Sequence, residues 1–173
     1  MRWQQLLVDM YQRMSQQLVQ VLTGLTVEDL QKRPAKGANP IGWLAWHVTR
    51  SMDRILGDIV LGEQLWIKEG WHTKFNRPPD ANDTGYGHTD AQVDSLIIPD
   101  VQTLLGYHNA VMEPLLRYLA GLSEEELDRH HSSLLYSGAT REVHKRLTLS
   151  DLEHVGQAAY VRGLIKGHRW SGV

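Results

Sequence analysis

The 173-residue chain contains no cysteine, and neither sign of charge dominates it. Without cysteine it can form no disulfide, thiolate nucleophile or cysteine zinc knuckle, so any transition metal must be held by histidine, carboxylate and water. Its 18 lysines and arginines stand against 20 acids, which gives a formal net charge of −2 with nine neutral histidines. This near-balance argues against a nucleic-acid partner held mainly by phosphate neutralisation.

Long apolar runs are also missing. No stretch approaches the roughly 18 residues that span a bilayer, and the amino-terminal sequence MRWQQLLVDMYQRM lacks an apolar core of signal-peptide length. We therefore expect a soluble cytoplasmic protein with no membrane partner. The length corresponds to about one domain, so we expect a single domain over residues 1–173, with 168–173 as a flexible tail.

Apolar residues recur at helical spacing in four long segments, and no segment alternates convincingly as a strand. The segments run from about Trp3 to Leu25, from Asn39 to about Gly62, from Asp100 to Leu122 and from near Thr140 to near Gly167. Four amphipathic helices with apolar faces to bury predict an all-α four-helix bundle. Capping residues at Thr26, Thr89 and Ser123 predict short additional helical turns.

The second and third segments are separated by a long connection, from Lys68 to Pro99, that is rich in Gly, Pro, Asn and Asp. A connection of this length is uncommon in a compact domain and is usually functional or partly disordered. Its stretch DTGYGHT is no phosphate-binding loop, because it lacks a following Lys-Ser or Lys-Thr and a preceding strand. The chain also has no G-x-S-x-G nucleophile elbow.

Four ionisable residues occupy positions on the apolar stripes that the pattern reserves for leucine or alanine. They are His47 in the second segment, His108 in the third, and Asp151 and His154 in the fourth. Burying a polar group without a partner costs about 1–3 kcal/mol. Four such groups in one bundle therefore call for mutual satisfaction or for a shared ligand.

His47, Asp151 and His154 form the candidate metal site. Asp151 and His154 are three residues apart and can project from one helical turn, with Ser150 as a weaker alternative to Asp151. Two imidazoles and a carboxylate from facing helices are typical of metal sites in bundle cores, and three protein ligands plus water are typical of a catalytic metal. The alternative interpretation is a buried His–Asp hydrogen-bond network that only sets helix register.

A short internal near-repeat also connects the two histidines. VLTGLTVEDL (residues 21–30) resembles YLAGLSEEEL (residues 118–127), and the helix that follows each copy carries a His-Val pair. This pattern predicts two helix pairs related by a pseudo-twofold axis, with His47 and His154 near the axis.

Other histidines and aromatics receive weaker assignments. His108 alone is more simply interpreted as a hydrogen-bonded core histidine, and its alternative role is a catalytic proton carrier or a partner of a metal ligand. The residues of the long connection that could line a substrate entrance are His72, Tyr86 and His88. Trp43 and Trp46 flank His47, and we expect them to pack as core or as an interface. Aromatic surfaces near Trp43, Trp46 and Trp66 exceed what four thin stripes can cover, so we expect a homodimer.

Four blocks, in the same order, resemble the DinB/YfiT-like superfamily: NPIGWLAWHVTRSMDRILGDIVLGEQLW, DTGYGHTDAQV, LLGYHNAVMEPLLRYLAGLSEEELDR and DLEHVGQAAYVRGLIKG. More narrowly, the chain is similar to uncharacterised bacterial members of this superfamily, which also includes mycothiol-dependent maleylpyruvate isomerase and bacillithiol transferases. The resemblance implies a four-helix bundle with a long crossover between the second and third helices. Because members of this superfamily often form dimers, the resemblance also implies a homodimer.

The resemblance further implies a divalent metal, commonly zinc or nickel, held by a histidine of the second helix and a pair of residues in the fourth. His47 and His154 match two of these positions. Ser150 stands where relatives usually carry His or Glu, and Asp151 is the candidate substitute.

Two functions are consistent with these observations. The first is a metal-dependent enzyme, a low-molecular-weight-thiol S-transferase or a hydrolase, in which the metal activates an external thiol or water toward an unidentified small-molecule substrate. The second is a non-catalytic small-molecule-binding or interaction protein with a degenerate metal site, which the departure at Ser150 favours.

Overall fold

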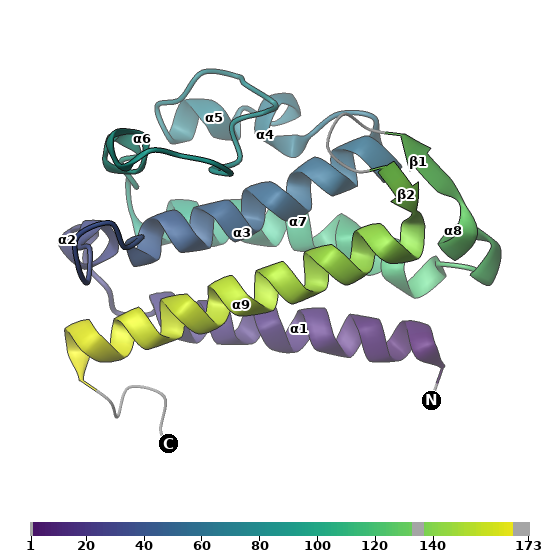
Figure 1. Ribbon diagram of the computed structural model, residues 1–173, viewed down its shortest axis with the longest axis horizontal. Coiled ribbons are helices and arrows are strands. Elements are labelled where there is room, and N and C mark those ends of the chain that lie inside the picture. Colours follow the sequence, from purple (N-terminus) through teal and green to yellow (C-terminus); the bar gives the residue numbers. More distant parts are fainter. Residues whose placement is uncertain (1, 133–136, 168–173) are drawn as a thin grey trace.

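Four long helices dominate the computed structural model, which describes the backbone of residues 2–132 and 137–167 and the side chains of residues 2–130 and 149–167. They are α1 (Trp3–Leu22), α3 (Ile41–Leu56), α7 (Val101–Gly121) and α9 (Thr140–Lys166). α3 packs against α7 and α9, and α1 packs against the same two helices (Figure 1). The predicted all-α four-helix bundle is confirmed; the tail at 168–173 lies outside the described residues.

Shorter elements connect the long helices. α2 (Val27–Gln31) follows α1, and α8 (Glu124–Asp128) follows α7. Between α3 and α7 lie the π-helical turn η1 (Gly57–Leu61), α4 (Leu65–Lys68), α5 (Trp71–Lys74) and α6 (Asp90–Ser95). An antiparallel hairpin of β1 (His130–Ser132) and β2 (Ser137–Ala139) precedes α9. Among the described residues, every helix is too short or too polar to span a bilayer.

Side-chain caps begin the helices at the predicted residues. Thr26 and Thr89 each form a complete capping box with the side chain three residues further on. Asp100 and Ser123 accept hydrogen bonds from the backbone N–H groups three residues on, at 2.6 Å and 3.1 Å. These bonds satisfy amide donors that have no partner within the helix.

The crossover between α3 and α7 covers α3 on the side that faces away from the bundle (Figure 1). The sequence predicted one buried stripe on this helix, but every residue from 41 to 56 except Ser51 is buried. Trp43, Trp46 and Trp66 are at most 5% exposed. Trp43 and Trp46 therefore pack as core, which is one of the two expectations for them. The predicted exposed aromatic surface is wrong, because the crossover buries these rings within one chain, and the homodimer remains a prediction without that support.

Arg50 ties the crossover to α3. Its guanidinium is fully buried and donates hydrogen bonds to the carbonyl oxygens of Asp80, Ala81 and Asp83 at 3.4, 3.3 and 2.9 Å. It also donates to Oε1 of Gln64 at 2.9 Å. A buried charge is tolerated only when it is paired and hydrogen-bonded, so this side chain holds the crossover in one position.

Asp53 supplies the opposite charge. One of its carboxylate oxygens lies 3.4 Å from Nη1 of Arg50 and also accepts hydrogen bonds from the Trp66 amide at 2.7 Å and the Tyr107 hydroxyl at 2.6 Å. The other oxygen accepts from the Leu65 amide at 2.8 Å. Burial raises the pKa of Asp53, and these hydrogen bonds and Arg50 oppose that effect. The carboxylate thus joins α3, α4 and α7.

Replacing Asp53 with alanine should strongly destabilise the fold, because it leaves the Arg50 guanidinium buried without its counter-charge. We expect the free energy of unfolding to fall by about 3–5 kcal/mol. Urea denaturation followed by far-ultraviolet circular dichroism measures this change. The control is Asp58→Ala, at an exposed position in η1, which should change the value by less than about 0.5 kcal/mol. Equal effects of the two substitutions would contradict the prediction.

Candidate metal centre

α3 and α9 pack side by side and bring two of the three predicted ligands together. The imidazole centroids of His47 and His154 lie 4.8 Å apart, with the ring planes at 78°. His47 is buried and His154 is partly exposed. Two imidazoles that bind one zinc ion through nitrogen at about 2.0–2.1 Å place their centroids about 5 Å apart. The observed spacing is thus compatible with a shared metal.

Hydrogen bonds set the tautomers of both rings. Nδ1 of His47 lies 2.5 Å from the Thr84 carbonyl oxygen, and because a carbonyl only accepts, Nδ1 carries the proton. Nδ1 of His154 lies 2.9 Å from Oε1 of Gln157 and is protonated for the same reason. In the neutral rings Nε2 then presents its lone pair, and no hydrogen bond from the described residues reaches either Nε2 atom.

The environment of His47 keeps its imidazole neutral. The pKa of His47 is lowered to about 4, chiefly by burial and also by neighbouring His154 and His88, while the hydrogen bond to Thr84 acts in the opposite direction. At pH 7 the ring is therefore unprotonated at Nε2. A neutral imidazole is the form that binds metals.

The backbone at Gly85 closes over one side of the His47 ring, and Trp43 stacks on that ring at a centroid distance of 4.7 Å. A Cβ atom on Gly85 would lie 2.8 Å from Trp43 and 3.0 Å from Nδ1 of His47. Gly85 also has φ of +92°, which side-chain-bearing residues rarely adopt. Glycine at this position therefore allows the crossover to approach the imidazole.

His88 positions this part of the crossover. Its Nδ1 accepts a hydrogen bond from Nε1 of Trp43 at 3.2 Å, so its proton is on Nε2, which donates to Asp83 at 2.9 Å. Arg77 donates to the other carboxylate oxygen of Asp83 at 2.5 Å, and Arg50 donates to the Asp83 carbonyl. Both nitrogens of His88 are engaged, so this ring is not free to bind a metal in this arrangement.

The two other predicted entrance residues differ in position. Tyr86 is 87% exposed and lies between Gly85 and Gly87 in the loop that covers His47. His72 belongs to α5, where its Nδ1 donates to the Arg77 carbonyl at 3.2 Å and its ring makes an edge contact with Trp66. Tyr86 thus borders the site, whereas the contacts of His72 lie within the crossover.

Asp151 is fully buried in α9, and neither of its carboxylate oxygens has a hydrogen-bond partner among the described residues. Burial raises the pKa of this carboxyl well above its usual value. No three His, Asp or Glu side chains of the described residues are grouped closely enough to hold one metal ion, so Asp151 does not join the imidazole pair. Ser150, the alternative ligand, is partly exposed. The residues present therefore fit a metal that is bound by two imidazoles, and no third protein ligand among the described residues lies close enough to complete the set.

His108 is a fully hydrogen-bonded core residue. The Thr49 hydroxyl donates to the Ala45 carbonyl at 3.0 Å, so its oxygen accepts from Nδ1 of His108 at 3.2 Å. Nε2 of His108 then accepts from the Ser15 hydroxyl at 2.9 Å. Burial lowers the pKa of His108 to about 4. With both nitrogens engaged inside the bundle, its contacts are those of a structural residue.

Several residues that organise the site have no clear signal in the sequence. Arg50 and Asp53, three apart on a helix, have the spacing of an ordinary surface ion pair. Thr84 contributes only its backbone carbonyl, which no side-chain pattern reveals. Gln157 is the exception, because it lies three residues after His154 and can reach that ring from the same helical face.

The two buried histidines predict a loss of stability in acid. Unfolded histidine has a pKa near 6.5, so protonation between pH 6.5 and 4 favours the unfolded state. The contribution of these two histidines to stability should be complete above pH 6.5. The free energy of unfolding should then fall as the pH is lowered toward 4, by up to about 3 kcal/mol for each of His47 and His108. Urea titrations across this range should show a shallower slope for His108→Gln. The exposed control His130→Gln should retain the parent slope, and a flat parent profile would refute the assignment.

Gly85→Ala should displace the loop from His47, whereas Gly87→Ala is a matched control. Both glycines have positive φ, but a Cβ on Gly87 meets nothing within 4 Å. Each substitution should cost about 1–2 kcal/mol from the backbone alone, and Gly85→Ala about 1–3 kcal/mol more from overpacking. Near-ultraviolet circular dichroism, which reports on Trp43 and Trp46, should change only for Gly85→Ala. Identical behaviour of the two variants would show that the loop does not approach the ring closely.

Comparisons with known proteins agree with this fold. The crystal structure of a conserved protein from Enterococcus faecalis superposes with a TM-score of 0.86 at 24% sequence identity, covering 96% of this chain and 99% of that one. At this identity the similarity shows the fold alone. No curated protein matches the chain. A sequence profile described as the DinB superfamily matches residues 10–156, and the chain therefore belongs to the DinB superfamily.

Proposed function

We propose that this protein is a metal-dependent enzyme in which His47 and His154 bind a divalent ion, zinc or nickel, through their Nε2 atoms. The observation that carries the proposal is the pair of adjacent imidazoles with both protons held on Nδ1. Metal-binding histidines are usually oriented in this way, by a carbonyl or carboxylate on the far nitrogen. The Thr84 carbonyl and the Gln157 amide oxygen would serve as these orienting groups.

Asp151 is our candidate for the third ligand, although its carboxylate does not join the imidazole pair in the structure and would have to move toward it when a metal binds. It lies one turn before His154 on α9, and both of its oxygens are buried without a hydrogen-bond partner in the part of the chain that the structure describes. A nearby cation would stabilise the ionised carboxylate and offset the desolvation that raises its pKa. Ser150 is the weaker alternative, because a neutral hydroxyl binds divalent metals poorly.

The proposed reaction is S-transfer from a low-molecular-weight thiol, or hydrolysis, on a small-molecule substrate. A divalent metal supplies the chemistry by lowering the pKa of a bound thiol or water, so that a nucleophile forms near neutral pH. The thiol would come from solution, because the chain has no cysteine. Trp43 stacks on the His47 ring and Gly85 lies close to its Nδ1 atom, so both restrict the position of the imidazole.

A second candidate is a small-molecule-binding protein without catalytic activity. Two observations favour it: Ser150 occupies a position where a ligand is expected, and the described residues contain no group of three ligands. Metal content distinguishes the two functions, since a binding protein with a degenerate site would not retain the ion at neutral pH.

Substitution of either histidine should remove most of the bound metal. After reconstitution with zinc or nickel and removal of free ion, elemental analysis should find near-stoichiometric metal in the parent and much less in His47→Ala and His154→Ala. Asp151→Ala should lower the metal content more than Ser150→Ala, because an ionised carboxylate is the better ligand.

Two histidine variants provide the controls for this experiment. His108→Ala and His72→Ala should retain the metal content of the parent, because the hydrogen bonds of both residues within the described part of the chain go to residues other than His47 and His154. Equal metal content in the parent, His47→Ala and His154→Ala would exclude the site and the enzyme with it.

A further inference from the structure

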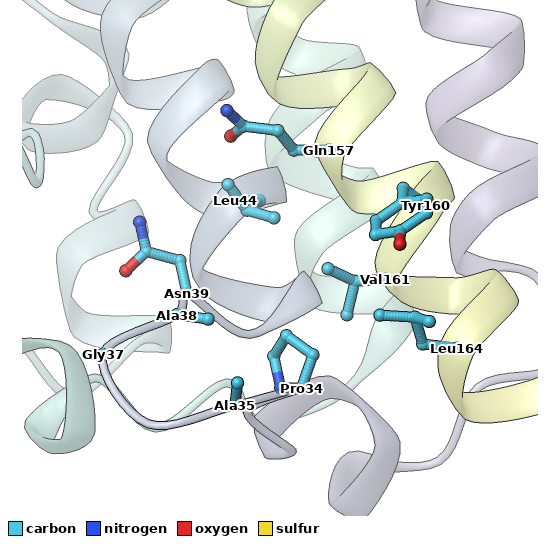
Figure 2. A pocket seen from close by; sticks show the side chains of 10 residues that line it. All are labelled: Pro34, Ala35, Gly37, Ala38, Asn39, Leu44, Gln157, Tyr160, Val161 and Leu164. Carbon is cyan, nitrogen blue, oxygen red and sulfur yellow. The ribbon is translucent and has the colours of Figure 1, made fainter.

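A pocket of about 480 Å³ lies between the connection 34–39, the beginning of α3 and the carboxyl-terminal half of α9 (Figure 2). Its lining is mostly apolar and includes Pro34, Ala38, Leu44, Gln157, Val161 and Leu164. Binding sites for small molecules usually have volumes of about 300–1,000 Å³ and are lined by apolar side chains with a few polar groups. The size and lining of this pocket match that description.

The pocket adjoins the imidazole pair through both helices. Gln157 lines the pocket, and its Oε1 accepts the hydrogen bond from Nδ1 of His154. Leu44, also in the lining, lies three residues before His47 and is its neighbour along α3. One end of the pocket is therefore formed by Gln157, the residue that orients His154, a candidate metal ligand.

The two ends of the pocket differ in polarity. Gln157 lies at the end nearest the imidazoles, and Pro34 and Ala35 lie at the opposite end, with Leu44 and Val161 between them (Figure 2). Among the described residues, the Nε2 amide group of Gln157 makes no hydrogen bond. The pocket thus offers a polar group at the imidazole end, and the lining beyond it is mostly apolar and includes one further amide, that of Asn39.

Large side chains at the rim are left uncovered. Tyr160 is 71% exposed and Leu164 is 58% exposed, and both face the pocket from α9. An exposed apolar surface beside a pocket that contains a polar group is typical of a ligand-binding site. An occupant with an apolar body would remove this surface from water.

We propose that this pocket binds a small molecule with an alkyl or aryl body, whose polar group lies at the Gln157 end next to the imidazole pair. Binding in the pocket requires only the residues that line it. That the bound molecule is the substrate, with its reacting group directed to the metal, rests on the proposed function.

Binding of n-alcohols to metal-free protein tests the pocket. Isothermal titration calorimetry of the series from n-butanol to n-octanol should show affinity rising about fourfold with each methylene until the pocket is filled. An affinity that does not depend on chain length would overturn the proposal.

Two pocket variants and one control make this test specific. Ala38→Phe, which fills the pocket, should weaken binding of n-octanol by about tenfold or more, whereas Ala120→Phe, the same change at an exposed position on α7, should have no effect. Leu164→Ser removes apolar wall at an exposed position and should weaken n-octanol binding about fourfold or more without affecting folding. The proposal would be overturned if both single variants, Leu164→Ser and Ala38→Phe, bound n-octanol as tightly as the parent. If a second copy of the chain covers this surface instead, the alcohols do not bind and Leu164→Ser reduces self-association in sedimentation velocity, which also overturns it.

The matching n-alkanethiols, titrated into zinc-loaded protein, connect the pocket to the metal. We expect each thiol to bind more tightly than its alcohol, and we expect this advantage to disappear in His154→Ala while alcohol binding persists. If the alcohols bind but zinc adds nothing for the thiols, the proposed function fails and the pocket stands. If thiols bind zinc with no dependence on chain length, the pocket fails and the metal site stands.

Discussion

The buried guanidinium of Arg50 is the interaction on which the rest of this structure depends. It lies in the middle of α3 with no exposure to water, so its charge and its donors must all be matched by the protein. Asp53 supplies the charge, and carbonyls of the crossover supply acceptors. A long connection with little regular structure is thereby held against the bundle at a definite position. The crossover in turn gives α3 its second buried face.

The geometry of the candidate metal centre follows from this constraint. Arg50 donates a hydrogen bond to the carbonyl of Asp83, and the next carbonyl along the chain, that of Thr84, accepts a hydrogen bond from Nδ1 of His47. The bundle brings His47 and His154 together, but the crossover determines which nitrogen of His47 carries the proton. The bundle and the crossover therefore each contribute to the arrangement, and the centre needs both to present a lone pair.

The sequence predicted the bundle well because helical periodicity reports directly on which faces are buried. The same periodicity singles out His47 and His154 as polar residues on apolar stripes, and the structure places their rings next to each other. Arg50 and Asp53 escaped this reasoning, because charged residues on a helix ordinarily indicate a solvent-facing side. The crossover buries them, and its sequence has no regular spacing of apolar residues from which this packing could be predicted. The exposed aromatic surface predicted from Trp43, Trp46 and Trp66 failed for the same physical reason.

The contrast between His108 and Asp151 separates a structural polar residue from a candidate functional one. Both lie on apolar stripes and both are almost completely buried. His108 recovers the cost of desolvation through hydrogen bonds to Ser15 and Thr49, whereas the Asp151 carboxyl has no such partner among the residues that the structure describes. A chain optimised for stability alone would carry leucine at position 151, because an unsatisfied buried carboxyl lowers stability. Such a residue one turn before His154 is consistent with a role in binding a cation, since a cation is the partner that would stabilise its charged form.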